Sequence, residues 1–349
     1  MSVLFPASVV GSLPRPAWVR DLLECRDQIN PEEFQRRIDS AVGFAIGMQE
    51  AAGLDVISDG EWRRWSYIGV IADLCQGFER TFVEGRSWHS VTEPITAGQT
   101  GCIAAEARFL KAHTDKLIKV CLPSPYLLGV RMWDKEHSRK AYPTRRQFME
   151  ALIPFLRNEL LLVRDAGANI VQIDDPHLCL FVDESVRDQF KDWKSEAELC
   201  VDLINQVVSG ITGIKLGVHL CRRNKGRDGW VGEGGYGPIL PFLKKINVHQ
   251  LVMEFTIPVA GDFSALEGLP DDKEIGLGCV DVRNAEIDPP QHIVERVERA
   301  LKYVEAGRLT LNPDCGFAPG NAADIPFDEA YRKLCCESQA AAILRSSHG

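Results

Sequence analysis

A histidine and a cysteine stand one residue apart at the end of an apolar run, in the stretch LGVHLCRRN at residues 216–224. If this run is a strand, His219 and Cys221 point to the same side of it, because side chains two residues apart share a face. Imidazole nitrogen and thiolate sulfur are both good zinc ligands. The His-x-Cys pair alone is a weak signal, since a core histidine beside a core cysteine gives the same pattern.

Two further residues strengthen the metal interpretation. Glu254 lies at the end of the apolar run 250–255, and Cys315 lies near the end of the run 308–317. Together the four side chains offer one nitrogen, two thiolates and one carboxylate, a ligand set that suits zinc. Ligands spread over three strand ends are typical of a catalytic site. We therefore predict a Zn²⁺ site at His219, Cys221, Glu254 and Cys315.

Zinc at such a site would favour one kind of chemistry. A bound metal ion lowers the pKa of a coordinating thiol, so a substrate thiol would be held as its thiolate at neutral pH. The thiolate, and not the thiol, is the nucleophile. Four protein ligands fill a tetrahedral site, and the hard carboxylate of Glu254 is the ligand that we expect to yield to sulfur. The sequence therefore predicts S-alkylation of a small thiol by an alkyl donor.

These residues require a framework of strands that end together. Short apolar runs rich in β-branched residues alternate with amphipathic helical patterns such as 31–53, 145–167 and 289–307. The eight runs cover residues 8–13, 54–61, 117–123, 169–176, 215–221, 250–255, 274–282 and 308–317. The alternation predicts an α/β fold, a single TIM (β/α)8 barrel over residues 1–349, with the site at the carboxyl ends of the strands. An open doubly wound sheet is the alternative, but no strand precedes a GxGxxG loop.

Two segments are longer than a barrel needs. Residues 79–113 form a partly polar excursion between the second and third strands, which we predict to be an inserted hairpin or lid. Residues 222–237 form a glycine-rich loop after the fifth strand, and its glycines would let it close over a substrate. Arg222 and Arg223 begin this loop, and we expect them to meet an anionic group on the thiol or the donor.

Composition excludes several classes of partner. The net charge of −9 argues against binding to nucleic acid or to an anionic membrane surface. No apolar run reaches transmembrane length, and the N-terminal stretch MSVLFPASVV has no basic region before an apolar one. The eleven cysteines lack framework spacing, which is typical of a reducing cytosol. We therefore predict a cytoplasmic protein that acts on small molecules, with a homo-oligomer left open.

Six motifs occur in an order that belongs to a known family: VVGSLPRP, GLDVISDGE, IVQIDDP, HLC, MEF and LNPDCGF. Over roughly residues 5–340 the sequence resembles the C-terminal catalytic domain of cobalamin-independent methionine synthase and its shorter single-barrel relatives. The resemblance implies a methyltransferase with zinc on the four ligands named above and homocysteine as the thiol. It also implies roles in substrate binding for four further residues.

Val10 and Ser12 match the positions that hold the homocysteine carboxylate, and Glu61 and Asp174 match the acids that bind its amino group. Simpler roles are open for two of them, since Ser12 could cap a helix and Glu61 could pair with a neighbouring arginine, Arg63 or Arg64.

The seventh strand departs from the family. Asp281 is kept, but Arg283 stands where the family has a histidine that transfers a proton. Arginine is a poor general acid but is well suited to holding a carboxylate, sulfonate or phosphate. His177 is our candidate proton donor in its place. The methyl donor is therefore open at this point: a corrinoid, with or without a corrinoid protein partner, fits the sequence as well as folate does.

Other activities stay open at this point. The runs 219–239 and 253–266 are similar to epoxyalkane:coenzyme M transferase, which activates a thiol on zinc but opens an epoxide. A metal-free lyase similar to uroporphyrinogen decarboxylase would not need His219 or the cysteines. A non-catalytic zinc carrier would bind the metal without changing its coordination when a thiol is added.

Overall fold

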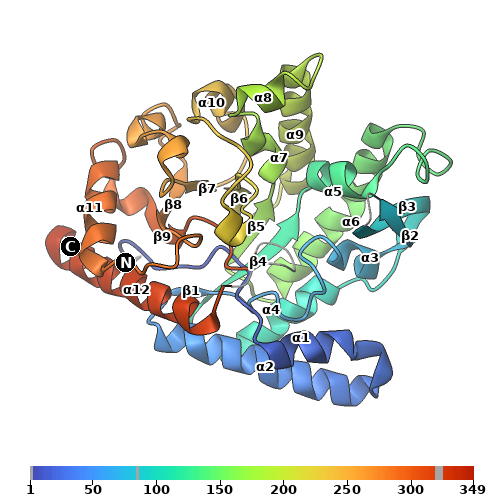
Figure 1. Cartoon of the computed structure of the whole chain (residues 1–349), viewed down its shortest axis with the longest axis horizontal. Coiled ribbons are helices and arrows are strands. Elements are labelled where there is room, and N and C mark those ends of the chain that lie inside the picture. The colour runs from blue at the N-terminus through green and yellow to red at the C-terminus, as the bar shows by residue number, and fades with distance from the viewer. Residues whose placement is uncertain (1–2, 84–85, 319–324) are drawn as a thin grey trace.

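The computed structural model describes residues 3–83, 86–318 and 325–349, and its centre is a curled parallel sheet. Every neighbouring pair of strands in this sheet is parallel, and helices lie outside the strands (Figure 1). The seven strands, in their spatial order, are β1 (Val56–Ile57), β4 (Leu117–Pro123), β5 (Ile170–Asp174), β6 (Lys215–Leu220), β7 (Gln250–Glu254), β8 (Glu274–Val280) and β9 (Leu309–Pro313). Each lies within or beside a run that the sequence predicts to be a strand, and the predicted α/β class is confirmed.

The predicted first strand, residues 8–13, is wrong as a regular strand. Only isolated bridges occur there, from Ala7 to Leu311 in β9 and from Ser8 to Val56 in β1. This segment therefore lies between the two ends of the sheet without forming a ladder.

Side chains of neighbouring strands take the place of that ladder. Lys119 Nζ donates to the carbonyl of Val9 at 2.6 Å, and Gln172 Nε2 donates to that of Val10 at 3.0 Å. A backbone carbonyl that is already satisfied by a side chain has no need of a partner strand. The hydrophobic pattern finds the segment, but it does not show which groups satisfy its carbonyls.

The predicted helices at 31–53 and 145–167 are present with capped ends, whereas the one predicted at 289–307 ends at Ala300. Asn30 caps α2 and Thr144 forms a capping box at the start of α6, while Gly167 follows α6 with a positive φ of 94°. The helices are α1 (Ala17–Glu24), α2 (Pro31–Ala51), α3 (Val70–Leu74), α4 (Cys102–His113), α5 (Pro125–Met132), α6 (Arg145–Asp165), α7 (Pro176–Leu180), α8 (Glu184–Arg187), α9 (Trp193–Val208), α10 (Leu240–Leu243), α11 (Pro290–Ala300) and α12 (Phe327–His348). None of these described helices is both long and apolar enough to cross a membrane.

The predicted excursion at 79–113 has two different parts. An antiparallel pair, β2 (Cys75–Val83) and β3 (Arg86–Ala97), begins four residues earlier than predicted and comes between β1 and β4 in the chain. The second part is α4, which packs on β4 as an ordinary helix of the fold. The pair docks on the segment after α5, where the amide of Ile95 donates to Tyr142 Oη at 2.9 Å.

Gly278 is a position where the sheet tolerates no side chain. A Cβ atom there would lie 2.6 Å from the carbonyl oxygen of Met253 and closer still to Asp314 Oδ1. We expect Gly278→Ala to lower the free energy of unfolding by about 3 kcal/mol, because the backbone must shift to admit the methyl group. Denaturant titration measures this loss. The control is Gly307→Ala, which meets no atom within 4 Å, and equal losses in both variants would contradict the prediction.

Candidate metal centre

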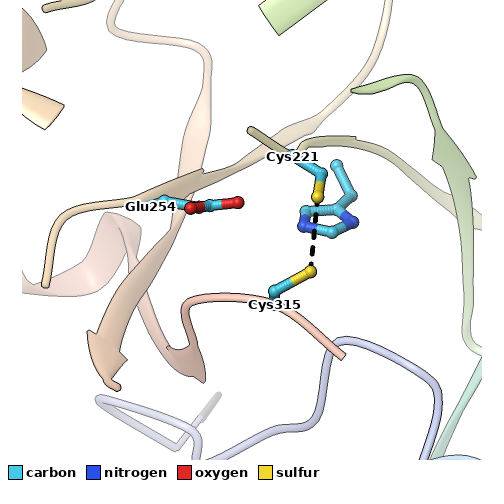
Figure 2. A group of neighbouring side chains, drawn as sticks. Cys221, Glu254 and Cys315 are labelled. Atoms are coloured by element: carbon cyan, nitrogen blue, oxygen red, sulfur yellow. Dashed lines mark hydrogen bonds between the residues drawn. The ribbon is translucent and has the colours of Figure 1, made fainter. Parts of the chain in front are cut away.

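The four predicted metal ligands come together at the carboxyl ends of the strands. His219 is in β6, and Cys221 is the first residue after that strand. Glu254 ends β7, and Cys315 lies just beyond β9. Their ligand atoms all lie within 4.8 Å of one another. Figure 2 shows the sulfurs of Cys221 and Cys315 facing each other, with the Glu254 carboxylate directed toward them. The four side chains are therefore arranged around a single point.

The distance between the two sulfur atoms fits a shared metal ion. Cys221 Sγ and Cys315 Sγ are 3.3 Å apart, whereas a disulfide bond is about 2.05 Å long. Two Zn–S bonds of about 2.3 Å at a tetrahedral angle place their sulfurs roughly 3.8 Å apart. A metal ion therefore needs only a small opening of the thiol pair.

His219 presents a free nitrogen to the same point. Its Nδ1 lies 3.3 Å from Asp174 Oδ1, on the neighbouring strand β5, where the two residues are in register. Its Nε2 is buried and has no hydrogen-bond partner among the described residues. A carboxylate that orients one ring nitrogen while the other binds metal is the usual arrangement of ligating histidines. The donor set therefore fits a metal ion such as zinc.

Glu254 is held by two donors while it faces the sulfurs. The amide of Arg222 donates to its Oε1 at 2.9 Å, and Arg283 Nη1 donates to its Oε2 at 3.1 Å. Arg283 also contacts Asp314 and lies 3.3 Å from Asp281, so it is buried among three carboxylates. Burial raises the pKa of Asp314 to about 6 although Arg283 opposes this effect.

The structure gives Arg283 protein carboxylates as partners in place of an anionic group of a substrate. Its guanidinium binds the carboxylates of the protein, and it is not among the described residues that line the cavity. Asp281 accepts from the amide of Arg283 at 2.8 Å and does not line the cavity either.

Arg222, predicted to bind substrate, also points away from the site. Its side chain is fully buried, donates to the carbonyl of Gly234 at 2.6 Å, and lies over the ring of Tyr236 at 4.8 Å. It directly follows Cys221, and an extended backbone sends successive side chains to opposite sides. Because Cys221 faces the metal point, Arg222 faces the interior behind it. The prediction for Arg222 is therefore wrong.

A cavity opens beside the metal ligands, and several predicted residues line it. These are Val10, Ser12, Glu61, Asp174, His219, Cys221, Arg223 and Cys315. Its described lining contains no residue of β2 or β3, so a lid role for that pair stays a prediction. Ser12 does not cap a helix, because the residue that precedes α1 is Pro16 and the Ser12 Oγ accepts from the amide of Ala318 at 3.4 Å.

Two carboxylates and a thiol form a second cluster in this cavity. Atoms of Glu61, Cys121 and Asp174 lie within 4.8 Å of one another. Burial raises the pKa of Glu61 to about 7, although Arg64 opposes the shift. The sequence analysis does not name Cys121. Its place near the end of a predicted strand is the feature that could have indicated it: in β4 it is in register with Gln172, and Gln172 donates to Asp174.

The two arginines that could have neutralised Glu61 have other partners. Arg63 pairs with Asp39 at 2.7 Å, and Arg64 binds both oxygens of Glu106. The simpler role for Glu61, a direct ion pair with one of them, is therefore not what the structure contains. Its carboxylate faces the cavity instead.

His177 follows the cavity-lining residue Pro176, but its own side chain does not line the cavity. It is in the first turn of α7 and is not among the described residues that line the cavity. Burial, together with Arg223, Arg131 and Arg145, lowers the pKa of His177 to about 3. A ring that stays neutral at physiological pH is a poor proton donor. Nothing in this arrangement supports the predicted role.

Known proteins are similar to this chain over nearly its whole length. A family model described as the catalytic domain of cobalamin-independent synthase matches residues 5–325. A methionine synthase of Pyrococcus horikoshii is 27% identical over 351 residues, covering 98% of this chain and 93% of that protein. One of Sulfurisphaera tokodaii is 26% identical over 355 residues, with coverages of 98% and 93%.

The fold matches as well. The solved structure of a B12-independent methionine synthase from Shewanella sp. W3-18-1, in complex with selenomethionine, superposes with a TM-score of 0.79 at 22% identity and covers 99% of both chains. The order of the motifs, the family model and the fold agree along nearly the whole sequence. The chain therefore belongs to the family of the cobalamin-independent synthase catalytic domain.

Proposed function

We propose that this protein is a zinc-dependent methyltransferase that methylates the sulfur of homocysteine. The observation that carries the proposal is the convergence of His219, Cys221, Glu254 and Cys315, with a free His219 Nε2, beside a paired acidic cluster in one cavity. The family and its methionine synthase relatives support the same assignment.

The metal would be held by these four residues. When bound, zinc acts as a Lewis acid that favours the deprotonated form of a substrate sulfur. Asp174 keeps His219 in the orientation that leaves Nε2 free. Arg283 and the Arg222 amide hold both oxygens of Glu254 and would fix the orientation of its carboxylate toward the metal. In this proposal Arg283 is a positioning residue.

The other residues of the cavity would orient the amino acid. Glu61 and Asp174 offer two carboxylates to an ammonium group, and Val10 and Ser12, which line the same cavity, would bind the carboxylate. The reaction forms one C–S bond and breaks the bond between the methyl group and its donor. The thiol proton leaves to solvent or to a base before the attack.

The remaining features of the proposal concern the whole chain. We propose that residues 1–349 form one (β/α)8 barrel, in which the bridged segment at Ala7 and Ser8 stands in for an eighth strand. The mouth of this barrel would be the active site. A cytoplasmic location, a homo-oligomer and a corrinoid protein partner stay predictions.

X-ray absorption at the zinc edge tests the proposal. We expect the zinc-loaded protein to gain one sulfur ligand when homocysteine is added, and to remain unchanged with methionine, which has no thiol. Coenzyme M serves as a second thiol, and a response to it alone would favour thiol addition to an epoxide. A protein that binds no zinc would support the metal-free lyase, and a spectrum that no thiol alters would support the zinc carrier.

A further inference from the structure

We propose that Arg223, in the wall of the cavity, binds an anionic group of the methyl donor, a carboxylate or a phosphate. The evidence for the anion site itself comes from the residues that line the cavity. Its assignment to the donor rests on the proposed function, because that function places the amino-acid substrate on the acidic side.

Arg223 is the central observation. It lies two residues after the metal ligand Cys221, lines the cavity, and has a backbone φ of +56°. A residue other than glycine is strained in this left-handed region, and such strain gathers at functional sites. No described residue forms a hydrogen bond or an ion pair with its guanidinium. The backbone is thus held in a costly conformation that keeps an unpaired cation in the cavity.

The two other arginines of the same loop behave differently. Arg222 donates to backbone carbonyls in the interior, and Arg227 donates to the carbonyl of Arg283 at 2.8 Å and pairs with Glu329. Both therefore hold the loop in place. Arg223 makes no such contact with the described part of the chain, so support of the loop does not explain it.

Among the described residues, the cavity leaves Arg223 without a counter-charge. By contrast, Arg15 donates to the carbonyls of Glu61 and Arg64, and Lys225 is exposed to solvent. A zwitterionic amino acid brings one ammonium group, which the acids would take, and one carboxylate, which balances a single cation. A half-buried guanidinium without a counter-charge, such as that of Arg223, is costly. A second anion, brought by the other substrate, would remove that cost.

The neighbourhood of His177 shows how positive this wall is. Burial lowers the pKa of His177 to about 3, and the guanidinium groups of Arg223 and Arg131 contribute to the shift. The imidazole therefore stays uncharged, which leaves the arginines as the charged groups of this wall. Arginine holds a carboxylate or a phosphate through two parallel hydrogen bonds, which suits either chemistry.

The test measures anion binding by calorimetry in the zinc-loaded protein saturated with homocysteine, at constant ionic strength. The probes are glutarate, for a carboxylate, and inorganic phosphate. We expect one probe to bind to the wild type, and Arg223→Gln to weaken that binding at least about tenfold, as expected for the loss of a charge-assisted hydrogen bond. Arg227→Gln is the matched control from the same loop and should bind the probe as the wild type does.

A second variant separates function from fold. Arg223→Gly removes the strain at φ +56°, so we expect it to raise the melting temperature while it abolishes anion binding. Failure of both probes to bind to the wild type, or equal binding to Arg223→Gln, would overturn the proposal. A parallel loss of homocysteine affinity in Arg223→Gln would assign Arg223 to the substrate carboxylate and would overturn the assignment to the donor. If homocysteine binds to no variant while Arg223→Gln still loses the anion, the proposed function fails and the anion site stands.

Discussion

Replacing Cys315 by serine is expected to lower the affinity for zinc at least about 100-fold and to abolish methyl transfer, since a hydroxyl is a far weaker zinc ligand than a thiolate. The substitution also leaves Cys221 Sγ without the sulfur that lies 3.3 Å from it. His219→Ala should act in the same way, because it removes the buried Nε2 that has no described partner. Competition with a chelating indicator measures the affinity, and circular dichroism checks the fold.

Cys279→Ser provides the control for the cysteine variant. Cys279 is as buried as Cys315, but it is in β8, where its thiol lies 3.5 Å from the carbonyl oxygen of Asn312 and is outside the group of metal ligands. A serine at this position keeps a donor for that carbonyl, so zinc affinity should not change. An undiminished zinc content in both Cys315→Ser and His219→Ala would mean that the metal, if bound, is elsewhere.

The clustering of the four candidate metal ligands was predictable from sequence, because the position of each ligand depends only on its own strand. The chemical types of His219, Cys221, Glu254 and Cys315, together with their places at the ends of apolar runs, are sufficient to bring them to one edge of a parallel sheet. A parallel sheet fixes the relative height of strand ends, so distant residues meet without further information.

The roles of the arginines were not predictable in the same way. The side chain of Arg283 is taken by Glu254 and Asp314, which come from two other strands, and nothing in the run CVDVRN indicates these partners. The partner of a long charged side chain depends on tertiary neighbours. For the same reason the sequence did not indicate that Arg222 would be buried and Arg223 left unpaired. The irregular first strand has a similar origin, in the side chains that satisfy its carbonyls.

Glu61→Gln is expected to weaken homocysteine binding roughly 30-fold or more at pH 8, the usual scale for removing one member of a buried charge pair. Glu61 is almost fully buried, and its carboxylate lies within 4.8 Å of Asp174 in the cavity. An ammonium group between the two acids would relieve their repulsion. The amide of glutamine has no charge to offer and leaves Asp174 as the single acid.

The raised pKa of Glu61 makes the homocysteine affinity of the wild type depend on pH in a way that Glu61→Gln should not show. Because burial raises the pKa of Glu61 from 4.5 to about 7, its charged form is populated only above that value, and the affinity for the amino group should fall as pH falls through 7. The same shift acts on stability with a definite sign. The folded protein binds more protons than the unfolded chain between pH 4.5 and 7, so the stability contributed by this group falls as pH rises across that window.

Glu61→Gln should therefore change homocysteine affinity and stability in opposite directions. At pH 8 the variant should bind homocysteine more weakly and melt at a higher temperature than the wild type, whereas at pH 4.5 the difference in melting temperature should vanish. Calorimetry with 4-mercaptobutanoate, which keeps the thiol but has no amino group, corrects for the pH dependence of the thiol itself. That ligand should bind equally to both proteins. Equal weakening of both ligands would show that Glu61 shapes the cavity without binding the amino group, and the acidic cluster would then lose its assigned role.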